Sequence, residues 1–181
     1  MKYDIEYILK IYQRYHSEAH RCYKQKCYIG SFVLYGAALE ALLLSFCFVY
    51  AEAVRKTSVY LNKKKRCKRK RGIFLEFTLK ELLDIARKLN WIPFDEKVEN
   101  IGKVENWVQW VKETRNLVHP ACWLKPDKYF GNIHRLMRDT CFKEYKKFVK
   151  ISEETISGID YLLQGKINKD LMKWCKKRKR A

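Results

Sequence analysis

An apolar segment at residues 29 to 50 (IGSFVLYGAALEALLLSFCFVY) constrains the fold more than any other part of the sequence. Its length is close to the roughly 20 residues that a transmembrane helix needs, so a single membrane span is one interpretation. However, Glu40 lies near the middle of the segment, and a lone carboxylate in lipid is costly without a partner from another helix. The other segments are amphipathic and need an apolar surface to pack on. We therefore favour a buried central helix over a membrane span.

Turn-forming residues are scarce in the chain. Its 181 residues include only 7 Gly and 3 Pro, so the structural elements must be long, which favours helices over many short strands. Thr78 and Glu81 have the spacing of a capping box, in which the two side chains cap a helix N-terminus reciprocally. Apolar residues recur every three or four positions, and this period predicts helices at residues 3 to 25, 28 to 62, 78 to 89, 95 to 118 and 132 to 163.

These elements predict an all-α fold. One domain of four to five helices accounts for residues 1 to 165, and residues 166 to 181 form a basic C-terminal tail. The seven cysteines are an odd number without CxxC pairs, which indicates reduced thiols in a cytoplasmic protein. One group of candidate metal ligands is present, but structural zinc sites usually take their ligands from loop knuckles, so we expect no metal and no cofactor. The group consists of His16, His20, Cys22 and Cys27.

Positive charge is concentrated in two runs. The chain has 39 Lys and Arg against 20 Asp and Glu, a formal charge of +19, and this balance favours a polyanionic partner. We expect the first run to be an exposed inter-helix loop or a frayed helix end and the second to be an exposed tail, and both to bind RNA phosphates without reading sequence. An acidic partner protein, or solubility alone, would also account for the runs. Their cations are Lys63, Lys64, Lys65, Arg66, Lys68, Arg69, Lys70, Arg71, Lys176, Lys177, Arg178, Lys179 and Arg180.

The segment TRNLVHP contains the residues with the most chemical potential. Arg115 and His119 are four apart, so a helix would place both on one face. The residue before a proline avoids helical geometry, so His119 is expected where the helix opens to solvent. Glu40 needs a cation if it is buried, and Arg115 is its predicted partner. The motif is therefore either functional or structural, with Arg115 neutralising Glu40 and His119 at the end of its helix.

Three segments in this order resemble HEPN-like domain proteins. The segments are YIGSFVLYGAALEALLL, TLKELLDIARKLNWI and TRNLVHP, followed by a long amphipathic helix, and together they span about residues 25 to 163. The resemblance implies a helical bundle, frequent homodimerisation and, in active members, a metal-independent endoribonuclease. Many members belong to toxin-antitoxin or phage-defence systems, with an antitoxin protein as partner, whereas others are non-catalytic adaptors.

The resemblance also implies roles for individual residues. His119 would act as general base or acid when the RNA 2′-hydroxyl attacks the phosphate. Arg115 would stabilise the charge that develops on the phosphate, and Asn116 would orient either group. Active members usually separate the Arg and the His by four to six residues, whereas three residues separate them here. A ribonuclease and a non-catalytic RNA- or protein-binding adaptor of the same fold are the two resulting hypotheses.

Overall fold

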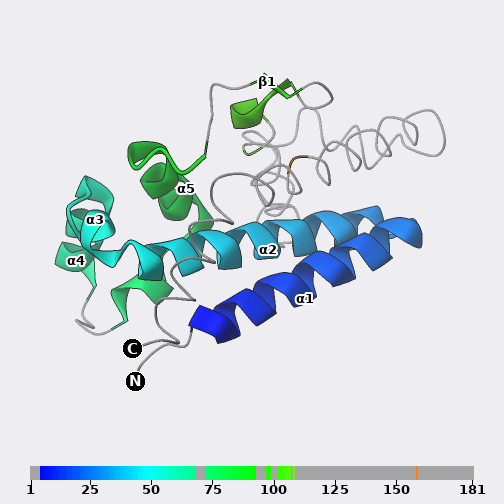
Figure 1. Cartoon of the computed structure of the whole chain (residues 1–181), viewed down its shortest axis with the longest axis horizontal. Coiled ribbons are helices and arrows are strands. Elements are labelled where there is room, and N and C mark those ends of the chain that lie inside the picture. Colours follow the sequence, from blue (N-terminus) through cyan, green and yellow to red (C-terminus); the bar gives the residue numbers. More distant parts are fainter. Residues whose placement is uncertain are drawn as a thin grey trace, which may run out of the picture.

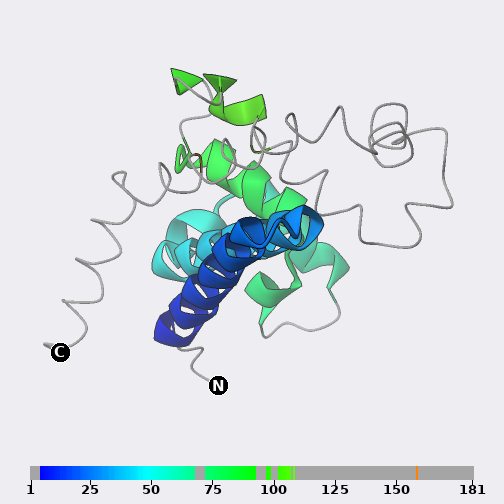
Figure 2. The same ribbon diagram turned by 90° about the vertical axis from the view of Figure 1, so that its right-hand side faces the viewer.

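The fold is given by a computed structural model that describes residues 5–67, 72–92, 97–98, 102–106, 108 and 158. Two long helices, α1 (Ile5–Lys24) and α2 (Tyr28–Val49), form an antiparallel pair. In Figure 1, α2 runs through the middle of the described elements, with α1 on one side and α5 (Leu79–Lys88) on the other. Figure 2 shows the same elements turned by 90°, with α5 above the pair.

The turn between α1 and α2 follows from hydrogen bonds that end α1. Lys26 has a left-handed backbone (φ 64°), and its N–H donates to the Tyr23 carbonyl at 2.9 Å. The N–H of Cys27 donates to the Cys22 carbonyl at 2.8 Å. These two bonds form a Schellman motif, which satisfies carbonyls that the helix end would otherwise leave without donors. The chain therefore reverses within three residues.

The central helix α2 is buried on more than one face, which confirms the prediction for this segment. On the side of α1, it forms a small core in which Ile8 and Tyr12 pack with Ala38 and Leu42. The hydroxyl of Ser31, which is 1% exposed, donates to the Ala19 carbonyl at 2.9 Å and links the two helices. No helix within the described residues has the length and hydropathy that a membrane span requires.

A second and larger core packs on an adjoining face of α2. It contains buried residues of α2, of the 3₁₀ helix η1 (Ile73–Glu76) and of α5. Phe74 and Phe77 stack with ring centroids 6.1 Å apart, and Phe48 of α2 contacts the Phe74 ring edge to face at 5.2 Å. Such aromatic pairs stabilise a core beyond the effect of their buried area.

The prediction of one continuous helix over residues 28 to 62 is wrong. The chain instead forms α2, a short α3 (Ala51–Arg55) and α4 (Ser58–Arg66). The break at Tyr50 coincides with its packing against Trp91, with ring centroids 5.7 Å apart. The break at Thr57 has a local cause, because its side chain accepts a hydrogen bond from the Tyr60 N–H and caps α4. Its hydroxyl also donates to the Val54 carbonyl at 2.7 Å.

The capping box predicted for α5 is confirmed. The Thr78 hydroxyl accepts a hydrogen bond from the Glu81 N–H at 3.3 Å, and the Glu81 carboxylate accepts one from the Thr78 N–H at 2.8 Å. The apolar face predicted for α5 is buried at Leu79, Leu82, Leu83 and Ala86, whereas Leu89, predicted for the same face, is half-buried. Ile85 is buried as well, although it was not predicted.

The helix predicted to begin at residue 95 begins later. Residues 97 to 103 contain a short antiparallel pair, β1 (Lys97–Val98) and β2 (Gly102–Lys103), in which Lys97 lies opposite Lys103. Residues 104 to 106 and 108 are helical, and Val104 and Val108 are buried. Gly102 has a poor helix propensity, which favours this late start. Apart from this pair, the described residues are all-α, in agreement with the predicted class.

Candidate nucleic-acid interface

The last turn of α4 contains the start of the first basic run, so residues 63 to 66 form the end of a helix, which is one of the two forms expected for this run. The four cations of this turn differ in their surroundings. Lys64, Lys65 and Arg66 are exposed, whereas Lys63 is half-buried. The Lys63 ammonium donates to both oxygens of the Glu81 carboxylate, at 2.9 and 3.2 Å. Lys63 therefore anchors α4 to α5, and its three neighbours point their charges into solvent.

Glu81 has three functions at this contact. It caps α5, accepts hydrogen bonds from the Lys63 ammonium and neutralises one positive charge of the basic run. Burial alone would raise the pKa of Glu81, but hydrogen bonds from Thr78 and Lys63 outweigh it, so the pKa is lowered from its ordinary value of 4.5. These hydrogen bonds stabilise the ionised form.

The lowered pKa of Glu81 predicts an acid-sensitive contact between α4 and α5. A carboxylate with a depressed pKa in the folded state stabilises the protein above the pKa of the unfolded chain, and this stabilisation is lost as pH falls through the folded value. The free energy of unfolding, measured in urea from about pH 5 down to pH 3, should therefore fall more steeply for wild type than for Glu81→Gln. Glu76→Gln, which changes an exposed glutamate of η1, is the matched control and should follow wild type. Equal slopes for wild type and Glu81→Gln would refute this role.

The basic surface is wider than the run that defines it in the sequence. Arg55 and Lys56 are exposed just before α4 begins. No Asp or Glu occurs between residues 53 and 75, so the segment has no carboxylate of its own. Sequence reasoning overlooked Arg55 and Lys56 as site residues, although the missing carboxylates indicated them. Lys68, Arg69, Lys70, Arg71 and the predicted contributors Lys176, Lys177, Arg178, Lys179 and Arg180 lie outside the described residues.

The surroundings of this surface favour contact with a polyanion. Lys64, Lys65 and Arg66 take part in none of the ion pairs found among the described residues. Leu61, which is 47% exposed, lies on the same face of α4 as Lys64 and Lys65, since residues three and four apart are neighbours on a helix. An anion can therefore bind these three cations without first displacing a carboxylate from them.

The predicted catalytic group lies outside the described residues. This applies to Arg115, Asn116 and His119, so their proximity stays a prediction. Their predicted structural partner, Glu40, is described: it lies midway along α2, partly buried, between the buried Leu39 and Ala41. The contact between Glu40 and Arg115 likewise stays a prediction.

The histidines and cysteines near the N-terminus form no metal site in the part of the chain that the structure describes. The His16 ring lies between two tyrosines, with ring centroids 6.0 Å from Tyr12 and 5.7 Å from Tyr35. The four described cysteines are free thiols. Burial raises the pKa of Cys47 to about 12, so this thiol is protonated and unreactive at neutral pH.

Comparisons with known proteins identify no relative. Protein-family models, curated proteins and solved structures contain no match to this chain. The fold therefore places the protein in the class of all-α proteins with a strongly basic surface.

Proposed function

We propose that this protein binds RNA through the basic end of α4 and the basic segments that follow it in the sequence. One observation carries the proposal: the last turn of α4 exposes three cations, while Glu81 neutralises only Lys63. Exposed Lys and Arg side chains contact phosphates and release condensed counterions, so they bind nucleic acid strongly and without sequence preference. The formal charge of +19 adds long-range attraction to the same partner.

The proposal includes a reaction. As a HEPN-like protein the chain would form a cytoplasmic homodimer and cleave RNA without a metal, in a toxin-antitoxin or phage-defence system with an acidic or antitoxin partner. The 2′-oxygen would bond to phosphorus as the bond to the 5′-oxygen breaks, leaving a cyclic phosphate; His119 would either take the proton of the 2′-hydroxyl or give one to the leaving 5′-oxygen, and water would serve the other step. Arg115 would stabilise the charge on the phosphate, with Asn116 orienting either group. The motif RNLVHP supports this assignment.

A second candidate is a non-catalytic adaptor of the same fold. The three-residue gap between Arg115 and His119 favours it. Each residue turns a helix by about 100°, so one residue fewer than the usual minimum of four rotates the histidine by that angle relative to the arginine. In the adaptor, Arg115 serves as the partner of Glu40, and the basic surface still binds RNA or an acidic protein.

Salt-dependent binding tests the proposed interface. Lys64→Ala/Lys65→Ala should weaken binding to a fluorescein-labelled uridine 20-mer about ten- to thirty-fold near 0.1 M salt. The slope of log affinity against log salt should fall by about 1.4, since each lost contact to a single strand removes about 0.7. Fluorescence anisotropy across a salt series, in EDTA to prevent metal-dependent cleavage, measures both quantities.

The matched control removes the same charge elsewhere. Lys80→Ala/Lys88→Ala changes two exposed lysines of α5, so it lowers the net charge equally but leaves α4 intact. It should lower affinity by no more than about three-fold, through the general field of the protein. Equal losses in the two variants would show that binding depends on net charge and not on the end of α4. Absence of RNA binding by wild type would refute the proposed function itself.

A further inference from the structure

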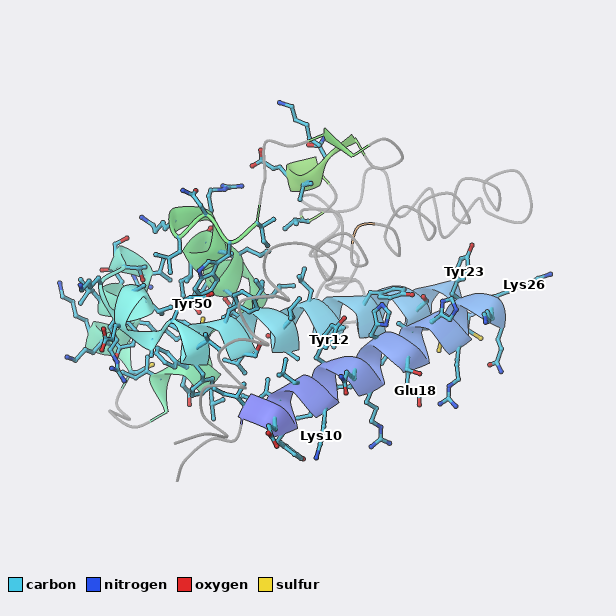
Figure 3. The ribbon with its side chains drawn as sticks, in the orientation of Figure 1. Lys10, Tyr12, Glu18, Tyr23, Lys26 and Tyr50 are labelled. Carbon is cyan, nitrogen blue, oxygen red and sulfur yellow. The ribbon has the colours of Figure 1, made fainter. Side chains whose placement is uncertain are left out.

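The outer face of α1 is a second surface with a distinctive chemistry. Figure 3 shows Lys10 and Glu18 on the side of α1 that points away from α2, whereas Tyr12 points toward α2. Tyr12 is 7% exposed and belongs to the core between the two helices. The side of α1 opposite this core is therefore in contact with solvent along the length of the helix.

Tyr7 is exposed on this outer face although it is aromatic. Its side chain is 65% exposed, the largest value among the large apolar and aromatic residues described. A tyrosine usually buries much of its ring, so packing among the described residues does not explain this exposure.

Two cations lie on the same stripe as Tyr7. Lys10 and Arg14 are exposed and follow Tyr7 by three and seven residues, so all three lie within about 60° of the helix circumference. The rise of a helix separates Lys10 and Arg14 by about 6 Å along its axis. Neither cation forms an ion pair with a carboxylate among the described residues. Glu18, one turn beyond Arg14, accepts its hydrogen bond from Arg21 and attracts Arg14 more weakly, through space. That hydrogen bond lowers the pKa of Glu18 and keeps it ionised.

We propose that the outer face of α1 binds single-stranded RNA, with a base stacked on Tyr7 and neighbouring phosphates held by Lys10 and Arg14. This proposal rests on the proposed function and adds a site on a different helix. An aromatic ring next to cations is the arrangement by which proteins bind single strands, because every base has a face that stacks and every nucleotide a phosphate. The two cations beside the ring favour a partner with regularly spaced anions, as the phosphates of a nucleic acid are.

The test separates the ring from the charges. Tyr7→Ala should weaken binding of the uridine 20-mer about five- to a hundred-fold, the range expected from losing one stacked base, while Tyr7→Phe keeps the ring and should bind within about two-fold of wild type. Lys10→Ala/Arg14→Ala should lower the salt slope by about 1.4. Ultraviolet crosslinking to the same RNA, followed by peptide mapping, should place a crosslink at Tyr7.

Tyr15→Ala is the matched control. Tyr15 is 36% exposed on the same helix but is turned by about 80° from Tyr7, so its loss should change affinity by less than about two-fold. Thermal unfolding followed by circular dichroism verifies that each variant keeps its fold. The side chain of Tyr7 is mostly solvated, so its removal should leave the midpoint within a few degrees of wild type.

Four other outcomes would contradict the site on α1, the proposed function, the stacking or RNA as the partner. If wild type binds RNA and Lys64→Ala/Lys65→Ala weakens it while Tyr7→Ala does not, the site on α1 is wrong and the proposed function stands. If wild type fails to bind RNA, both are wrong. If Tyr7→Phe loses as much affinity as Tyr7→Ala, stacking is wrong. Binding of polyglutamate that depends on Tyr7, without such a dependence for RNA, would replace RNA by an acidic protein.

Discussion

In the proposed ribonuclease reaction, His119→Ala is expected to lower the rate of metal-independent RNA cleavage about 10²- to 10⁴-fold, the usual contribution of a general acid or base. Arg115→Ala should cause a loss of similar order, because an arginine that stabilises charge on a phosphate acts in the transition state. The measurement uses a mixed panel of labelled RNAs in EDTA. DNA of the same sequences should remain intact, since it lacks the 2′-hydroxyl that attacks the phosphate.

Two controls identify what each variant changes. His134→Ala alters the other histidine of the C-terminal half, and it should cleave like wild type if only His119 transfers the proton. Glu40→Gln tests the structural role of Arg115. If Arg115 serves only to neutralise Glu40, Glu40→Gln and Arg115→Ala should destabilise the protein to similar extents in urea. Salt-sensitive RNA binding without any cleavage by wild type would favour the adaptor.

Local signals in the sequence predicted the parts of the fold that depend on local chemistry. The period of apolar residues located α1, and the spacing of Thr78 and Glu81 located the start of α5, because an amphipathic face and a capping box are both visible in one short segment. The buried position of α2 followed from its composition, since 22 residues with a single carboxylate need cover from other helices.

The predicted helix over residues 28 to 62 was wrong because a tertiary contact and a helix cap end helices at positions where the apolar period continues. Apolar residues continue at helical spacing past Tyr50, yet the helix ends there, beside the rings of Phe46 and Trp91. Trp91 is distant in the sequence, so this contact had no local signal. Thr57 did carry one, since a threonine before a new helical turn is a common cap.

At the candidate interface, too, the sequence could not predict what depends on contacts between helices. The run of lysines predicted a basic surface, but it did not distinguish Lys63 from Lys64, because the distinction depends on which side of α4 faces Glu81. Tyr7 lies outside the apolar period of α1, but this period alone could not show how far the ring is exposed. Sequence charge thus predicts the kind of partner, and the three-dimensional structure selects the side chains that can reach it.

Leu82→Ala is expected to lower the free energy of unfolding by about 2 to 5 kcal/mol, the range measured for large buried side chains. Leu82 is 1% exposed and belongs to the same core cluster as Leu39 and Leu43 of α2. Its removal leaves a cavity between α5 and α2, and the surrounding helices can close it only in part. Since small domains are stable by only about 5 to 15 kcal/mol, such a variant should be partly unfolded well below the wild-type midpoint.

Leu61→Ala supplies the matched control, since it makes the same change on a helix at a position that is 47% exposed. Intrinsic helix propensity differs little between leucine and alanine, so burial is the main difference between the two variants. Leu61→Ala should stay within about 0.5 kcal/mol of wild type in urea unfolding. Equal costs would show that α5 does not pack on α2 as described. Leu82 follows Glu81, which holds Lys63, so the Leu82 variant should also loosen the contact between α4 and α5. If the end of α4 is the proposed RNA site, this variant should bind RNA less tightly.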